Sequence, residues 1–302
     1  MRKDIYEQIT GKIVADLEQG VRPWLKPWSA EHAAGRITRP LRHNLVPYNG
    51  INVVMLWSAA EIAGYSAPIW MTYRQAQEIG GQVRKGETGE LVVYASTITR
   101  TETDQDTGEE SEEQVPFMKG YTVFNVEQIE GLPSQYYAPA EARLDPVQRK
   151  EHAEDFFAAT GADTRHGGNQ AYYAVLEDRI QMPPFETFRN AESYYATLAH
   201  ETTHWTRHAS RLDRSFGRKR WGDEGYAREE LVAELGAAFL SADLDLTLEP
   251  REDHAAYIGS WLKVLKQDKR AIFQAAAHAQ RAVDFLHGLQ DSNRQQERAL
   301  AS

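Results

Sequence analysis

Apolar residues recur at helical spacing in several separate segments of the chain. The first segment, residues 2–20, predicts an amphipathic helix that ends at Gly20, because its apolar positions lie three to four apart, at Ile5, Ile9, Ile13, Val14 and Leu17. The same spacing predicts a helix over residues 52–63, ended by Gly64. A shorter helix is expected after Thr72, a residue type that caps helix N-termini.

Two β-rich runs lie on either side of a polar segment. The runs cover residues 89–100 and 115–129 and are rich in β-branched and aromatic residues. The segment between them, residues 101–114, holds seven acidic residues and no basic one. Such a charged segment is typical of a solvated hairpin tip or loop between two strands.

A proline-containing segment, residues 133–146, separates these elements from a second set and is predicted to be a linker. We therefore predict an α+β fold with two domains, residues 1–132 and 147–302. The second domain is expected to be helix-rich with one short β-hairpin over residues 171–184 that turns near 177–178. Its helices are predicted over residues 148–161, 190–210, 225–246 and 253–290, the last with a break near 267–269.

The composition says more about which kinds of site the chain can form than about its fold. The chain of 302 residues is 41% hydrophobic and 26% charged, as in a globular protein, and has no cysteine. Disulfides, thiolate metal sites and a cysteine nucleophile are thereby excluded. No signal peptide or membrane-spanning run is evident, so a cytoplasmic location is expected. The net charge is −10, yet residues 1–50 hold eight basic and five acidic residues, a local charge of +3.

One predicted helix contains the sequence His-Glu-x-x-His. His200 and His204 lie four residues apart and so share a helix face, from which both imidazoles can point at one metal ion. Glu201 lies about 100° around the helix axis from His200, where a general base can take a proton from water. The plain alternative is a surface helix with two solvated histidines. The apolar residues Tyr195, Leu198 and Ala199 argue against it, because they predict a half-buried helix.

The next helix offers a carboxylate for a third ligand. Glu230 and Glu234 share a face, and we expect Glu230 to bind the metal and Glu234 to accept the N–H of a ligating histidine. Glu234 is the alternative third ligand. Glu229 is expected to be a solvated residue. Two histidines and a carboxylate suit one divalent ion, Zn²⁺ first, with Mn²⁺ or Fe²⁺ as alternatives.

The motifs HETTHW and EELVAELGAAFL resemble the zincin-like metallopeptidase domain of ArdC-type antirestriction proteins. In the first half, YNGINVVML, RKGETGELVVY and FNVEQIEGLP resemble the N-terminal domain of the same family, which also occurs in TraC-type conjugation primases. The resemblance implies a protein of plasmids and other mobile elements that binds single-stranded DNA and shields incoming DNA from host restriction. It also implies His200, His204 and Glu230 as metal ligands and Glu201 as the catalytic glutamate.

Single-stranded DNA binding requires aromatic rings for base stacking and cations for phosphates. The first half supplies both types, although a loop tryptophan more often packs than stacks. The candidate DNA-contacting residues are Trp24, Lys26, Trp28, Arg39, Arg42, Tyr48, Asn49, Trp70, Tyr73, Arg84 and Lys85.

Several functions are compatible with these motifs. The leading one is an antirestriction protein that binds single-stranded DNA and has a metallopeptidase domain, which acts on a host restriction enzyme or another protein. The main rival is a non-enzymatic DNA-coating factor with a structural metal. A metal-dependent nuclease and a DNA mimic are further alternatives; the first usually needs more carboxylates, and the second more acidic surface than one short run supplies. No membrane partner is expected.

Overall fold

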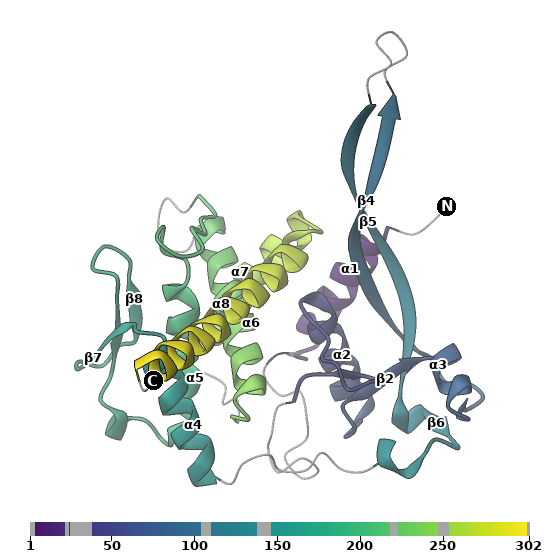
Figure 1. Cartoon of the computed structure of the whole chain (residues 1–302), viewed down its shortest axis with the longest axis horizontal. Coiled ribbons are helices and arrows are strands. Elements are labelled where there is room, and N and C mark those ends of the chain that lie inside the picture. Colours follow the sequence, from purple (N-terminus) through teal and green to yellow (C-terminus); the bar gives the residue numbers. More distant parts are fainter. Residues whose placement is uncertain are drawn as a thin grey trace.

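The computed structural model of the protein describes residues 4–21, 24, 38–103, 110–137, 146–217, 223–246 and 254–300. The fold is α+β, as predicted (Figure 1). Its N-terminal half contains, in order, α1 (Ile5–Glu18), β1 (Leu41–Arg42), α2 (Ile51–Ala63), β2 (Ile69–Thr72), α3 (Tyr73–Glu78), β3 (Gln82–Val83), β4 (Glu90–Thr103), β5 (Glu110–Asn125) and β6 (Ile129–Glu130). Its C-terminal half contains α4 (Pro146–Ala159), β7 (Asp163–His166), β8 (Tyr172–Ala174), β9 (Arg179–Met182), α5 (Ala191–Trp205), α6 (Glu224–Asp243), α7 (His254–Gln267) and α8 (Ala271–Leu300).

The helices predicted in the first half are present, and their ends are capped. The side chain of Asp4 accepts a hydrogen bond from the backbone N–H of Tyr6 at the start of α1. Helix α3 begins with a capping box between Thr72 and Gln75. Helix α2 ends at Gly64, whose φ of 72° is the left-handed conformation that glycine adopts without strain.

A four-stranded sheet in the order β1-β2-β5-β4 organises the N-terminal half. Strands β4 and β5 pair antiparallel from Glu90↔Val123 to Thr103↔Glu110 and form a long ribbon that projects from the body (Figure 1). The acidic segment was predicted to be a hairpin tip or loop, but the paired strands extend into it, as far as Thr103 and from Glu110 onward. Its residues 104–109 lie outside the described part.

The C-terminal half packs its helices beside a small sheet in the order β7-β9-β8. The antiparallel pair β8 and β9 confirms the predicted hairpin, and Asp178 in its turn has a φ of 47°. Strand β7, parallel to β9, was not predicted, because its residues 163–166 are polar and mostly exposed. The predicted helix break is confirmed between α7 and α8.

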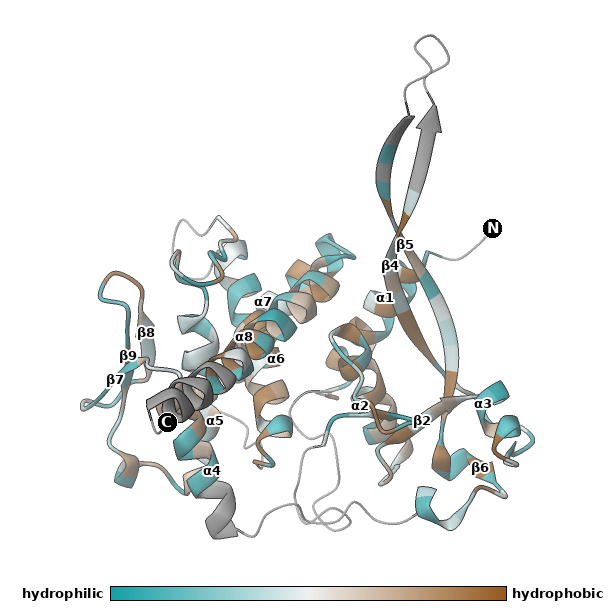
Figure 2. Ribbon diagram, viewed as in Figure 1, coloured by the Kyte–Doolittle hydropathy of each residue, from teal (hydrophilic) through white to brown (hydrophobic). Residues whose placement is uncertain are grey.

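The hydrophobic core continues across the predicted domain boundary. Helix α1 packs against α7, and α2 packs against α8. Trp24 lies edge-on to Trp261 of α7, with ring centroids 5.9 Å apart. Figure 2 shows hydrophobic residues on α2, α6 and α8. The two halves are thus held by a shared core, while the boundary between domains 1–132 and 147–302 stays a prediction.

None of the helices in the described ranges combines the length and apolar character that crossing a bilayer requires.

Candidate metal centre

Helix α5 places both motif histidines in the interior. The side chain of Asn190 caps its N-terminus by accepting a hydrogen bond from the backbone N–H of Ser193. From Tyr194 to Trp205 every residue of the helix is buried. His200 is 2% exposed and His204 is 8% exposed, so the alternative of two solvated histidines is wrong.

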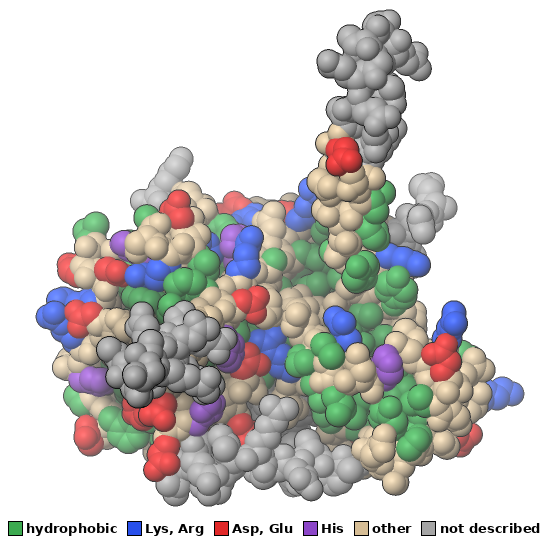
Figure 3. All heavy atoms as spheres, in the orientation of Figure 1, with side chains coloured by type: hydrophobic (Ala, Val, Ile, Leu, Met, Phe, Trp, Pro, Cys, Tyr) green, Lys and Arg blue, Asp and Glu red, His purple; other side chains and the backbone are tan. Residues whose placement is uncertain are grey.

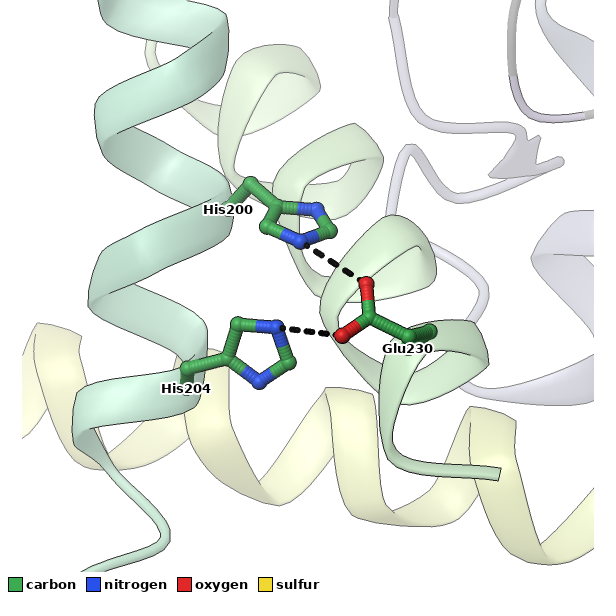
Figure 4. A group of neighbouring side chains, drawn as sticks. All are labelled: His200, His204 and Glu230. Atoms are coloured by element: carbon green, nitrogen blue, oxygen red, sulfur yellow. Dashed lines mark ion pairs between the residues drawn. The ribbon is translucent and has the colours of Figure 1, made fainter. Parts of the chain in front are cut away.

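Glu230 of α6 lies opposite the two imidazoles (Figure 4). Nε2 of His200 is 3.5 Å from Oε2 of Glu230, and Nε2 of His204 is 3.5 Å from Oε1 of the same carboxylate. One donor atom from each of the three residues lies within 4.8 Å of the others, an arrangement that can hold a metal ion. Glu234 contributes no atom to this group.

The other nitrogen of each histidine faces a different carboxylate. Nδ1 of His204 is 3.1 Å from Oε1 of Glu229, and Nδ1 of His200 is 3.3 Å from Oε1 of Glu234. A carboxylate partner holds the proton on Nδ1 of a neutral imidazole and leaves the lone pair of Nε2 for a metal. The two rings are therefore oriented with Nε2 toward the common point beside Glu230.

The expectation that Glu229 is solvated is wrong. Glu229 is 3% exposed and accepts two hydrogen bonds from Arg214, from Nε at 2.9 Å and from Nη2 at 2.7 Å. Arg214 is itself buried and also donates to Oγ1 of Thr206 and to the backbone oxygen of Thr203. This pair anchors Glu229 against His204. Sequence spacing gave no signal for it, because Arg214 lies in the loop after α5.

The buried histidines and carboxylates of this group shift one another's pKa values. Burial alone would lower the pKa of His204, but the carboxylates of Glu230 and Glu229 outweigh it and raise this pKa to about 10. Burial would raise the pKa of Glu229, but the hydrogen bonds from Arg214 lower it to about 2. The pKa of Glu230 is also lowered, by both histidines against the effect of burial. The pocket thus stabilises positive charge at the point where the three donor groups meet.

Four glutamates near this point are buried, namely Glu201, Glu229, Glu230 and Glu234. A buried arginine, Arg214, forms an ion pair with one of them, Glu229. Buried carboxylates are costly unless they are paired, and a divalent ion bound at this point would supply positive charge to them. Glu201 follows His200 on α5 and lies outside the group of three donors, as a general base should.

Tyr226 lies one turn before Glu230 on α6 and was not predicted. Its hydroxyl is 3.0 Å from that of Tyr257 on α7. Burial raises the pKa of Tyr226, and the negative charge of the nearby Glu230 raises it further, so the phenol stays neutral.

Gly236 sets how closely α6 approaches α5. A Cβ atom at this position would lie 2.5 Å from Cγ2 and 2.7 Å from Oγ1 of Thr203. Thr203 is fully buried, and its hydroxyl donates to the backbone oxygen of Ala199 at 2.8 Å, so its side chain cannot swing away. The absence of a side chain at Gly236 thus lets the backbone of α6 lie close to Thr203 of α5.

We expect Gly236→Ala to lower the free energy of unfolding by about 1–3 kcal/mol, because the overpacking outweighs the better helix propensity of alanine. Denaturant titration measures this change. Gly259→Ala on α7 is the matched control, since no atom lies within 4 Å of the added Cβ; it should be neutral or stabilising by up to about 1 kcal/mol. Equal stabilisation by both substitutions would show that α5 and α6 do not pack this closely.

The predicted DNA-contacting residues divide into three groups. Trp24, Trp70 and Arg39 are buried, with exposed fractions of 0%, 1% and 7%, and the structure contradicts their assignment. Arg39 forms a two-pronged ion pair with Asp243 at 2.7 and 2.8 Å, so its charge is already used to join the two halves. Tyr48 is also buried, at 7% exposed with the guanidinium of Arg42 over its ring, so the structure contradicts its assignment as well. Residues Arg42, Asn49, Tyr73, Arg84 and Lys85 are exposed, and Lys26 and Trp28 lie outside the described residues.

Comparison with solved structures covers nearly the whole chain. A metal-free crystal structure of antirestriction ArdC protein from the R388 plasmid is 49% identical in sequence, with a TM-score of 0.80 over 96% of this chain and 99% of that chain. The chain belongs to the ArdC family of antirestriction proteins. A Mn(II)-bound crystal structure of the same relative matches at 47% identity and a TM-score of 0.77, over 95% of this chain and 98% of that chain.

Family models agree with this assignment to the ArdC family. Residues 3–124 match the N-terminal domain of anti-restriction factor ArdC, and residues 151–278 match a zincin-like metallopeptidase. The resemblance predicted from the motifs is therefore confirmed. Protein y4eC of Sinorhizobium fredii (strain NBRC 101917 / NGR234), an uncharacterized protein, is 44% identical over 304 residues, which cover 99% of this chain and 96% of the relative.

Longer relatives contain an ArdC-like part. DNA primase TraC of Escherichia coli is 37% identical over 312 residues, which cover 98% of this chain but 28% of the primase. A second TraC primase of Escherichia coli is 37% identical over 303 residues, 20% of its length. The ArdC-family chain thus corresponds to a small part of each primase.

Proposed function

We propose that this ArdC-family protein protects incoming DNA from restriction, binds single-stranded DNA through its N-terminal half, and holds one divalent metal ion between α5 and α6. The observation that carries the metal proposal is the convergence of His200, His204 and Glu230 on one point. Two ligand atoms that each lie about 2.1 Å from a tetrahedral ion are about 3.4 Å apart. Nε2 of each histidine lies 3.5 Å from an oxygen of Glu230, Oε2 for His200 and Oε1 for His204, which is close to that spacing.

The donor chemistry favours Zn²⁺ and also accepts Mn²⁺, the ion named for the crystallised relative. Glu229 and Glu234 would orient the two imidazoles. Only one such group of ligands occurs among the described residues. A nuclease that uses two metals is therefore the less supported alternative.

A bound ion supplies Lewis acidity, which polarises a carbonyl group and lowers the pKa of water. Glu201, directly after the first histidine and outside the ligand group, would accept the proton of the attacking water and return it to the leaving amine. Helix α5 fixes the base relative to the ligands, because Glu201 follows His200 directly and His204 lies one turn further along the same helix. The proposed reaction is hydrolysis of a peptide bond in a host restriction enzyme or another protein.

Single-stranded DNA binding is proposed for the exposed residues of the first half. The candidates that remain from the sequence are Arg42, Asn49, Tyr73, Arg84 and Lys85. The match of residues 3–124 to the ArdC N-terminal domain and the similarity to part of a DNA primase support this proposal.

Glu201→Gln tests the enzymatic part, because it keeps the shape of the side chain but removes the base. We expect metal content to stay at the wild-type level and peptide hydrolysis to fall by about 10²- to 10⁴-fold, the usual contribution of a general base. The measurements are metal analysis of the purified protein, cleavage of candidate substrates, and protection of transferred DNA in a restricting host.

Full DNA protection by Glu201→Gln would separate the two activities. Protection would then not require peptide hydrolysis, and the metal ion would have only a structural role in it. The DNA-coating function would be preferred to the peptidase function. Loss of both protection and hydrolysis, with metal retained, is the result that the proposal requires.

A further inference from the structure

One face of the β4–β5 ribbon carries exposed aromatic rings. In the antiparallel register, Tyr94 lies opposite Lys119, Val92 opposite Tyr121, and Ser96 opposite Phe117. Directly opposed residues, and residues two apart on a strand, share a face of a sheet. Tyr94, Phe117, Lys119 and Tyr121 therefore lie together on one face, which we call the ribbon face, with Ile98 farther toward the tip.

These rings are unusually exposed for their size. The exposed fractions are 53% for Tyr94, 37% for Phe117 and 38% for Tyr121. Tyr94 and Phe117 contact one another with ring centroids 6.1 Å apart, so they form a small aromatic platform rather than isolated side chains. Figure 3 shows hydrophobic side chains at the surface of the ribbon below its grey tip. Contiguous exposed apolar groups usually mark an interaction site.

The ribbon is anchored at the base of this platform. On the opposite face, Leu91 and Val93 pack against the core, and Asn52 of α2 exchanges two hydrogen bonds of 2.8 Å with the backbone of Val93. The ribbon face thus presents its rings from a fixed support. A rigid platform loses little conformational entropy when a ligand binds.

The charge on the platform is positive. In residues 92–98 and 115–121, the only charged residue is Lys119. Its ammonium lies 4.9 Å from the ring centroid of Tyr121, on the same face as the other rings. The seven acidic residues of the hairpin lie beyond, within residues 101–114. An anionic ligand would therefore be held on the platform and repelled from the tip.

We propose that the ribbon face binds single-stranded DNA, with bases stacked on Tyr94, Phe117 and Tyr121 and a phosphate paired with Lys119. Aromatic rings accept any base once it is unpaired, and a neighbouring cation holds the backbone. Duplex DNA would not use this surface, because its bases are already stacked. The proposal rests on the single-stranded DNA binding proposed above and places it on residues that the sequence did not single out.

The test is binding of a fluorescein-labelled oligothymidylate to the full-length protein, measured by anisotropy. Tyr94→Ala, Phe117→Ala and Tyr121→Ala should each weaken binding by about 5- to 150-fold, the effect of losing one stacked base. Met118→Ala and Thr97→Ala are the controls, since both side chains point to the opposite face of the same ribbon. The controls should stay within about twofold of wild type, well below the loss of one stacked base.

Salt dependence distinguishes the roles of the ring residues and the lysine. Lys119→Gln should make the plot of log affinity against log salt shallower by about 0.7, as expected for one phosphate contact on a single strand. The ring variants should keep the wild-type slope. Thermal unfolding and metal content must match wild type for each variant, so that loss of binding is not loss of folding.

Photo-crosslinking locates the contact independently. An oligonucleotide with 5-iodouracil should crosslink to Tyr94, Phe117 or Tyr121, as identified by mass spectrometry. If wild-type protein binds the strand but the ring variants bind equally well, the ribbon face is wrong and the proposed DNA binding stands. If wild-type protein does not bind single-stranded DNA, both proposals fail.

Discussion

His204→Ala is expected to weaken binding of Zn²⁺ or Mn²⁺ by about 10²- to 10³-fold. Structural zinc sites bind with about 10–16 kcal/mol shared over four ligands, so one ligand contributes about 3 kcal/mol. His204 also joins the site to Glu229 and Arg214, and its loss leaves Glu230 with one imidazole partner. Competition with a chromogenic chelator measures the affinity, and the rise in melting temperature on adding metal should disappear.

His208→Ala is the control for this experiment. His208 follows the same helix, four residues after His204, but its Nδ1 contacts Oγ of Ser210 at 2.8 Å, and it takes no part in the metal group. The control should bind metal as wild type does. Equal affinity of the wild type and His204→Ala would mean that the ion, if bound, lies elsewhere.

Arg214→Met is expected to lower the free energy of unfolding by about 3–5 kcal/mol, because removal of one partner of a buried ion pair leaves the other charge uncompensated. Glu229 is the partner left behind, and it also holds His204 at 3.1 Å. Metal affinity should fall by about 10- to 100-fold, the usual effect of disturbing a group that orients a ligand. Denaturant titration and chelator competition measure the two effects separately.

A second substitution separates charge from packing. In Arg214→Met with Glu229→Gln, the uncompensated carboxylate is gone, so part of the stability should return. Metal affinity should stay low, because the amide is a weaker partner for Nδ1 of His204 than the carboxylate. If Arg214→Met alone is as stable as wild type, the buried pair does not have the role assigned to it.

The elements with strong periodicity could be predicted from the sequence. The caps at Asp4, Thr72 and Asn190 are local signals, and each marks a helix start in the structure. Strand β7 could not be predicted, because its polar residues pair through the backbone alone. The core shared by the two halves could not be predicted either. Hydrophobic periodicity shows which face of a helix is apolar, but it does not show which other element packs against that face.

The candidate site shows the same limit. His200, Glu201 and His204 are recognisable because helix geometry fixes their relation, and Glu230 is recognisable because it shares a face of the next helix with Glu234. Glu229 looks like a solvated charge until Arg214, which lies 15 residues earlier in the loop after α5, is placed against it. Trp24 and Arg39 look like DNA contacts by residue type, yet tertiary packing buries both of them against the C-terminal half.

The most direct test of the metal site is an anomalous-scattering map from crystals of the protein soaked with Zn²⁺ or Mn²⁺. The account predicts one strong peak about 2.1 Å from Nε2 of His200, from Nε2 of His204 and from a carboxylate oxygen of Glu230. A map with no peak between α5 and α6, or with the ion bound by other residues, would contradict it.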